Sequence, residues 1–567
     1  MSSPRCFNFY LKSQLKLFII FCIIFVGVVN SNSLCKDKKN CDEYESEDKD
    51  EERKLNIEDV ESRVSRLERR LRAMEQPVWQ IRGWPEDWEV CVEGPCKCRP
   101  ETKSISCWRY GLFDVPAGQL VPQDIIKLDL GSNQLTALHR DTFRNLTELK
   151  DLDLSNNMIE HLPLNSFYSL YSITHLRFSK NLLRDLHQNL FLRMRYLEIV
   201  DLSSNKLQTL PEGLFVASTA LLLLDISSNK ISELPTDIFF NLKELEDLLL
   251  SKNQLSHLDK NIFKDLINLK CLKLEENHLR ELQIGLFDSL GNLIELILRD
   301  NQIKVIPEDL FINLEAVTTL DLSNNLISQL NKEAFTGLKA LKELKLGKNH
   351  IKVLPKGIFL QIPALQQLVL YGNALEKLSD GDFQGLGNLT SLFLHSNRIR
   401  RLQSDVLKDT PFLKKLQLES NQLSYVPGRF LDSVPMIQQL RLSRNPWHCD
   451  CEVAYLAMWL RKMYFARNNH NINSNNHNTN DNNSNSNSNN NNNHNNTNSI
   501  ADKNVNRSNF WQSGAGAICL GPGTLGGKLV IELTFHQLCD GQWASMRGLA
   551  PRLPVELLTP SPPKSAQ

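Results

Sequence analysis

The sequence has no excess of charge of either sign and, beyond its amino-terminal stretch, no apolar run long enough to span a membrane. Lysine and arginine together number 65, and aspartate and glutamate also number 65. A balanced chain sets up no overall field that would draw it toward nucleic acid or an anionic membrane. We therefore expect no nucleic-acid partner, and any electrostatic recognition must be local.

Short motifs that accompany common catalytic sites are also missing. Neither H-E-x-x-H nor G-x-S-x-G occurs, and the carboxylates are spread along the chain rather than paired. The segment Gly521-x-Gly523-x-x-Gly526 matches a dinucleotide-binding fingerprint, but the sequence predicts neither a strand before it nor a helix after it. We predict a loop there, and no enzyme activity, cofactor or metal site for the chain.

The amino terminus has the order of elements of a secretory signal. Arg5, Lys12 and Lys16 precede the apolar run 17–29, and small polar residues follow. We predict a cleaved signal peptide over residues 1–33; an uncleaved anchor is the alternative, although a spanning helix needs roughly 20 apolar residues. The prediction is a secreted, extracellular protein without membrane insertion after signal cleavage, in a compartment where clustered cysteines form disulfides.

An asparagine recurs with a period of 24 over most of the chain. Around each lies the pattern L-x-x-L-x-L-x-x-N-x-L, for example Leu245, Leu248, Leu250, Asn253 and Leu255. Leu248 and Leu250 have the period of two of a short strand that buries one face. One such unit cannot cover its own leucines, so we expect the units to stack. The asparagines are Asn133, Asn157, Asn181, Asn205, Asn229, Asn253, Asn277, Asn301, Asn325, Asn349, Asn373, Asn397, Asn421 and Asn445.

Each repeat has further structural signals. The asparagine carboxamide, where the chain leaves the strand, is expected to bond backbone groups of adjacent turns. Prolines such as Pro211 and Pro235 follow the strand half and predict a convex side of turns and short 3₁₀ segments. A phenylalanine with the same period should stack as an aromatic spine. The phenylalanines are Phe143, Phe167, Phe191, Phe215, Phe239, Phe263, Phe287, Phe311, Phe335, Phe359 and Phe383.

This pattern resembles the extracellular leucine-rich-repeat family over roughly residues 91–540. The family includes Slit-like guidance proteins, Toll-type receptor ectodomains and acid-labile-subunit-like carriers. The resemblance implies an α/β-type solenoid: a right-handed horseshoe with a concave parallel β-sheet and a convex side of turns and short 3₁₀ segments. It also implies that partners bind on the concave sheet.

Cysteine clusters at both ends are expected to cap the terminal leucines. We place the amino-terminal cap at 91–120, the repeats at 121–444 and the carboxyl-terminal cap at 445–540. Four cysteines permit three pairings, and the residues alone do not choose between them or exclude zinc. The family resemblance implies the disulfides Cys91–Cys98, Cys96–Cys107, Cys449–Cys519 and Cys451–Cys539.

Several segments have compositions that cannot build a core. The carboxyl-terminal cap is interrupted at 468–509, and asparagine is by far the most frequent residue from 468 to 498. We predict a disordered insert there and assign no metal site to its scattered histidines. The acidic segment 34–54 and the tail 541–567 are also predicted to be disordered, and residues 77–90 to be a linker.

Residues 55–76 carry a heptad pattern. Its apolar positions are Ile57, Val60, Val64, Leu67, Leu71 and Met74, and arginines at g precede glutamates at e. We predict a short helix that either forms a homodimer or packs on its own chain, because three heptads are short for stable association. Cys35 and Cys41 then either bridge two chains or close a small loop.

Apolar side chains at outward positions of the strands are the candidate binding residues. One group is Ile199, Leu223, Leu249 and Ile297; the other is Val369, Tyr371 and Phe393, with His395 and Arg398 beside them. Apolar and aromatic groups on a polar face are common interface anchors, although single exposed apolar residues need no explanation. Cys271 also faces outward and is either an idle thiol or an interchain bridge.

Five sequons predict glycosylation at Asn145, Asn388, Asn482, Asn495 and Asn506. The first two lie outside the strand register, which leaves the concave face free.

The sequence thus predicts a secreted, non-enzymatic scaffold that binds an extracellular or cell-surface protein as a ligand, co-receptor, carrier or matrix adaptor. The alternative is an extracellular-matrix protein that binds a glycosaminoglycan through a basic surface near the carboxyl end of the repeats. The basic residues are Arg398, Arg400, Arg401, Lys408, Lys414, Lys415, Arg441 and Arg444.

Overall fold

The structure is a computed structural model that describes Val64, Leu67, Trp88 and residues 95–115, 120–476 and 514–539, with only the backbone of 467–476. Its contacts separate residues 1–64 from residues 65–567. The signal peptide, the segment 34–54, the tail 541–567 and Cys91 lie outside the described residues. Of the heptad segment, Val64 and Leu67 are described; both are helical, with 37% and 60% of their surface exposed.

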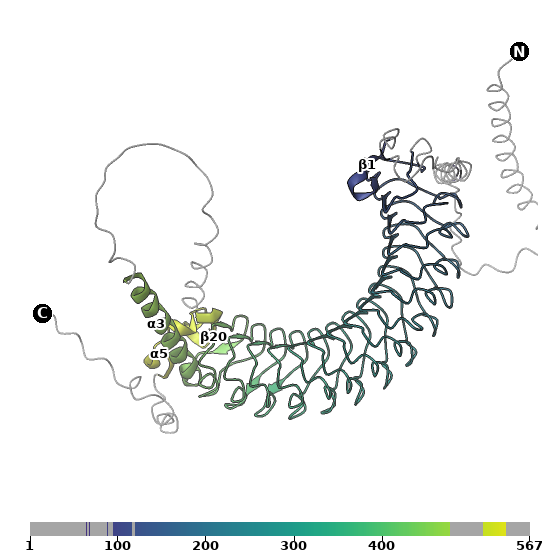
Figure 1. The fold of residues 1–567 in the computed structure, drawn as a ribbon. Coiled ribbons are helices and arrows are strands. Elements are labelled where there is room, and N and C mark those ends of the chain that lie inside the picture. The colour runs from purple at the N-terminus through teal and green to yellow at the C-terminus, as the bar shows by residue number, and fades with distance from the viewer. Residues whose placement is uncertain are drawn as a thin grey trace, which may run out of the picture. The chain divides into compact units, whose positions relative to one another are not determined.

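Each repeat contributes one three-residue strand to a 16-stranded sheet, and the repeats follow a curved path (Figure 1). The strands are β1 (Lys97–Arg99), β2 (Ser104–Ser106), β3 (Lys127–Asp129), β4 (Asp151–Asp153), β5 (His175–Arg177), β6 (Ile199–Asp201), β7 (Leu223–Asp225), β8 (Asp247–Leu249), β9 (Cys271–Lys273), β10 (Glu295–Ile297), β11 (Thr319–Asp321), β12 (Glu343–Lys345), β13 (Gln367–Val369), β15 (Ser391–Phe393), β17 (Lys415–Gln417) and β18 (Gln439–Arg441). All neighbours pair in parallel except β1 and β2, which form an antiparallel hairpin in the amino-terminal cap.

Residues that are one 24-residue period apart in the sequence pair directly in the sheet. Leu248 pairs with Leu224 on one side and with Leu272 on the other, and all three are fully buried. The middle residue of each strand therefore packs against its equivalents in the preceding and following repeats, as the sequence predicts. This arrangement confirms the parallel leucine-rich-repeat solenoid.

The asparagines form a continuous ladder of hydrogen bonds through the array. The Nδ2 of Asn253 donates to the carbonyl oxygens of Ile226 and Leu250, at 3.1 Å each, and its Oδ1 accepts from the backbone N–H of Ile231 at 3.2 Å. The same three contacts recur in the equivalent asparagines up to Asn445. One side chain thus satisfies backbone groups of two successive turns, which would otherwise be buried and unpaired.

The predicted phenylalanine spine is also present. Phe263 and Phe287 are fully buried, and their ring centroids lie 6.3 Å apart with an 8° angle between planes. The convex segments are turns, and residues 125–446 contain no helix of any kind. Two additional strands, β14 (Lys377–Leu378) and β16 (Arg401–Leu402), pair with each other beyond the main sheet.

The amino-terminal cap begins before its first cysteine. Trp88, in the predicted linker 77–90, is 7% exposed, belongs to the core and donates from Nε1 to Asp124 Oδ1 at 3.0 Å. A buried and hydrogen-bonded indole packs as part of the folded core, so Trp88, the one described residue of this segment, belongs with the cap. After the helical turn η2 (Pro100–Thr102), β2 joins the repeat sheet. A disulfide links Cys96 to Cys107, and Cys98 is also disulfide-bonded.

The carboxyl-terminal cap is assembled from two segments on either side of the asparagine-rich insert (Figure 1). Disulfides link Cys449 to Cys519 and Cys451 to Cys539, as the family resemblance implies. Its elements are β19 (Trp447–His448), η3 (Cys451–Val453), α3 (Ala454–Asn476), η4 (Gly514–Gly516), β20 (Cys519–Gly521), η5 (Gly523–Leu525), η6 (Val530–Glu532) and α5 (Phe535–Cys539).

Contacts across the insert hold this cap together. The Nε of Arg461 on α3 donates to the carbonyl oxygen of Ile531 at 2.7 Å, and the backbone N–H of Leu442 donates to the carbonyl oxygen of Ala515 at 2.9 Å. The helix α3 continues to Asn476, which differs from the disorder expected from residue 468 onward. A strand also precedes the Gly521–Gly526 loop, contrary to expectation, but the three-residue η5 follows it instead of a long helix.

Removing one rung of the asparagine ladder should be costly. We predict that Asn253→Ala lowers the free energy of unfolding by roughly 1–3 kcal/mol, because it leaves buried carbonyl and N–H groups without partners. Urea unfolding followed by circular dichroism measures the change. Asn189→Ala is the control, because Asn189 is exposed and its change should stay within about 0.5 kcal/mol. Equal losses in the two variants would contradict a structural role for the ladder.

Candidate functional site

The first and third residues of each strand point away from the core, because the middle residue is buried and side chains alternate along a strand. Every candidate binding residue except Tyr371, His395 and Arg398 occupies one of these two positions. The structure therefore places the candidates on one face, and the registers decide which of them are neighbours.

The first candidate group does not form a single surface. Ile199 and Leu223 pair directly as the first residues of β6 and β7. Leu249 and Ile297 are third residues, and Lys273 of β9 lies between them. None of these four residues lines the hollow on the concave face that is described below.

The second group does come together. Val369 of β13 pairs directly with Phe393 of β15, and the rings of Tyr371 and His395, two residues further along each chain segment, stack at 4.7 Å with a 7° angle between planes. These four side chains line an open hollow of about 580 Å³ on the concave face. We call them the aromatic platform. Arg398 is exposed, but it is not part of the hollow.

A glycine holds the tyrosine ring in place. A Cβ atom added to Gly347 would lie 2.7 Å from Cε1 of Tyr371, so the ring rests directly on the glycine backbone. On its other face, the ring contacts His395. Serine occupies the glycine's position in other repeats, for example Ser155 and Ser203, and would not leave room for the ring. The platform is therefore preorganised by its neighbours.

Positive charge surrounds the platform. The basic side chains in the lining of the hollow are Arg299, Lys345, Lys348, Lys415 and Arg441. Lys415 also lies over the ring of Phe393, with Nζ 4.7 Å from the centroid, which is a cation–π contact. On the same rim, Arg441 lies 3.6 Å from Glu419 and Lys345 lies 3.2 Å from Glu343.

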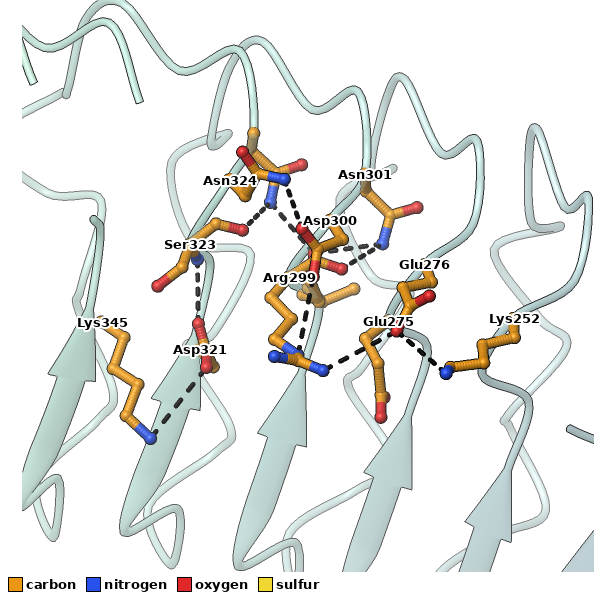
Figure 2. A network of polar contacts seen from close by, with 12 residues as sticks. Lys252, Glu275, Glu276, Arg299, Asp300, Asn301, Asp321, Ser323, Asn324 and Lys345 are labelled. Atoms are coloured by element: carbon orange, nitrogen blue, oxygen red, sulfur yellow. Dashed lines mark hydrogen bonds and ion pairs between the residues drawn. The ribbon is translucent and has the colours of Figure 1, made fainter. Parts of the chain in front are cut away.

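One side of the hollow borders a network of polar contacts that crosses several repeats (Figure 2). Glu276 forms ion pairs with Lys252 at 3.4 Å and with Arg299 at 3.8 Å, and Arg299 also lies 3.7 Å from Asp300. Asp300 in turn accepts from Asn324. The charges on this side are thus already compensated, and such exposed pairs contribute little to stability individually.

The imidazole of His395 is uncharged at neutral pH. Burial beside the tyrosine ring lowers the pKa of His395 below its ordinary value of 6.5, Arg441 lowers it further, and Glu419 opposes both. A neutral ring stacks on Tyr371 without carrying a charge into the apolar part of the hollow.

The other outward residues have simpler surroundings. Cys271 begins β9, and its Sγ lies 3.4 Å from Glu295 Oε2; burial and this carboxylate raise the pKa of the thiol to about 12, which favours the protonated form at neutral pH. Asn145 and Asn388 are exposed in the turns outside the strands. Asn482, Asn495 and Asn506 lie outside the described residues.

The basic residues near the carboxyl end of the repeats do not share one surface. Lys415 and Arg441 line the hollow, while Lys408 lies in a turn on the convex side and Arg401 lies in β16. The repeat period separates them, because residues at different places within a repeat point in different directions.

The sequence did not single out two sets of residues at the site. Gly347 lies under the Tyr371 ring, and four other residues line the hollow: Lys345, Lys348, Gln367 and Arg299. A signal was available for two of them: Lys345 and Gly347 stand one repeat before Val369 and Tyr371, and the fixed register makes them neighbours. The same register makes Tyr371 and His395 neighbours, but the sequence does not show that their rings stack, because stacking depends on side-chain rotamers.

Comparison with known proteins agrees with this architecture. A leucine-rich-repeat family model matches seven overlapping segments that together span residues 125–446, more than half of the chain. The chain belongs to the leucine-rich repeat family. Its caps carry the disulfides described above. No curated protein sequence matches it.

Solved structures share the fold. A chain of the glycosylated Toll–Spatzle complex of Drosophila aligns with 73% of this chain and 55% of its own length, at 21% identity and a TM-score of 0.54. A leucine-rich-repeat protein of Leptospira interrogans aligns with 59% of this chain and 83% of its own length, at 29% identity and a TM-score of 0.51. This chain thus spans about half the length of the Drosophila chain.

The glycine under the tyrosine provides a test of the platform. We predict that Gly347→Ser displaces the ring of Tyr371 and uncovers His395, so that the pKa of His395 rises toward 6.5. Titration of the His395 ring by NMR measures this. Gly131→Ser, at the same position of an early repeat, is the control and should leave the pKa of His395 low. A wild-type midpoint at or above 6.5 would refute the buried stack.

Proposed function

We propose that this protein is a secreted, non-enzymatic scaffold that binds an extracellular or cell-surface protein on its concave sheet. The observation that carries the proposal is the aromatic platform, in which Val369, Tyr371, Phe393 and His395 form a preorganised apolar surface within a polar face. Aromatic side chains that are rigid before binding lose little entropy on contact and are common anchors of interfaces.

The disulfides support an extracellular setting. They close both caps, as expected for proteins that fold in an oxidising compartment. As a separate observation, the helices in the described part of the chain are too short or too polar to cross a membrane. The related fold in the Toll–Spatzle complex belongs to a protein–protein assembly, in line with a binding role.

The glycosaminoglycan alternative has less support. Its basic residues are spread over the concave face, the short strand β16 beyond the main sheet, and the convex turns. Arg441 is also paired with Glu419. A polyanion needs adjacent unpaired cations along one path. The aromatic platform also has no role in binding a sulfated sugar chain through charge.

Two substitutions test the proposed surface. We predict that Tyr371→Ser combined with Phe393→Ser reduces capture of extracellular partners by about 1,000-fold, since two anchors typically contribute about 2 kcal/mol or more each. Secreted wild-type and variant proteins, immobilised in equal amounts, are compared in binding selections against cell-surface proteins.

The matched control is Tyr168→Ser with Leu192→Ser, which removes two exposed apolar side chains from the turns opposite the sheet. Both variants should be secreted at the wild-type level. If the concave variant keeps all its partners while the convex variant loses them, the working surface is the convex one and the proposal fails.

A further inference from the structure

Two ammonium groups in the hollow have no acidic partner. Lys348 and Lys415 both line it, and in the described part of the chain no carboxylate lies within ion-pair distance of either Nζ. In the order of the sheet they belong to repeats on opposite sides of Tyr371 and His395. The aromatic platform thus lies between two uncompensated positive charges.

We propose that the ligand of this hollow is an acidic peptide segment in which an aromatic or branched apolar side chain lies between two carboxylates. This inference rests on the proposed function and specifies the chemistry of the partner. The apolar side chain would pack on the Tyr371–His395 stack and on Phe393, and the two carboxylates would reach Lys348 and Lys415.

The platform accounts for the apolar part of this ligand. Val369 is 8% exposed at the floor, and the rings of Tyr371 and Phe393 stand partly exposed beside it. Because Gly347 and His395 fix the tyrosine ring from both faces, a ligand side chain meets a surface that is already formed. The contact therefore costs little reorganisation.

The two charges set a minimum spacing for the acids. From β12 to β17 there are three steps in the sheet, through β13 and β15, or about 14 Å at roughly 4.8 Å per step. Lys348 follows the end of β12, whereas Lys415 begins β17, so the two lysines are also offset along the strand direction. An extended peptide advances about 3.4 Å per residue, so the two carboxylates should be separated by about four residues or more. An anchor near the middle of this stretch would lie above the platform.

The same rim disfavours a dense polyanion. Asp300 and Asp321 line the hollow as well, and Glu343 and Glu419 pair with its other cations. A sulfated sugar chain would bring many negative charges close to these carboxylates, and the repulsion between like charges would weaken its binding. A peptide with few acids at the right spacing avoids them.

An unbiased selection tests the inference. A phage-displayed library of short random peptides is selected on the full-length wild-type protein. Phage that also bind the Lys348→Glu/Lys415→Glu variant are then removed. We expect the recovered sequences to carry an aromatic or branched apolar residue flanked by Asp or Glu. A synthetic peptide of the recovered consensus, measured by fluorescence anisotropy, should bind the double variant about tenfold or more weakly and should lose affinity as salt rises.

Lys180→Glu is the matched control. Lys180 occupies the same place in its repeat as Lys348, with the same left-handed backbone (φ 55° and 53°), but lies far along the array. This variant should bind the peptide like the wild type. Equal loss in Lys180→Glu and Lys348→Glu would show a non-specific charge effect and overturn the proposed site.

The remaining outcomes separate the two proposals. Recovered peptides that lack acids, or no recovered peptide, would overturn the acidic-ligand inference; the proposed function would still stand if partner capture depends on Tyr371 and Phe393. Binding of a heparin oligosaccharide that depends on Lys348 and Lys415, without any peptide selected, would instead assign the hollow to a glycosaminoglycan. If the Tyr371→Ser/Phe393→Ser variant still captures every partner of the wild type, the proposed function itself is overturned.

Discussion

The hydrogen bonds of one asparagine side chain in each turn are the constraint on which this molecule depends. Asn253 joins the carbonyl oxygens of Ile226 and Leu250 to the N–H of Ile231, and the same geometry recurs through the array. The chain must turn sharply at the end of each strand to build a narrow coil, and this turn leaves buried backbone N–H and C=O groups without backbone partners. The carboxamide satisfies them, so the leucines can stack without a polar penalty.

This ladder converts a period in the sequence into proximity in space. Because each turn has the same length and register, residues one period apart become direct neighbours on the concave sheet, as Val369 and Phe393 show. A binding surface can therefore be assembled from residues of several repeats without disturbing the core. The aromatic platform and its flanking lysines lie together in the fold, although Lys348 and Lys415 are far apart in the sequence.

Most of the fold was predictable because it repeats. The strand positions, the asparagine ladder and the Phe263–Phe287 stack follow from one periodic pattern seen many times. Features that occur once were harder: Trp88 looks like a linker residue until Asp124 is seen to accept its N–H, and α3 enters a segment whose composition predicts disorder. At the site, the sequence predicted which side chains face outward. It did not predict that Gly347 makes room for Tyr371, because that contact depends on rotamers.

Native-state hydrogen exchange tests the central constraint most directly. The backbone N–H groups that donate to asparagine side chains, such as those of Leu207, Ile231 and Leu255, should exchange slowly and at similar rates from the first repeat to the last. Uniform protection along residues 125–446 is the predicted result. Rapid exchange of these groups, while the strands themselves stay protected, would show that the ladder does not hold the turns together.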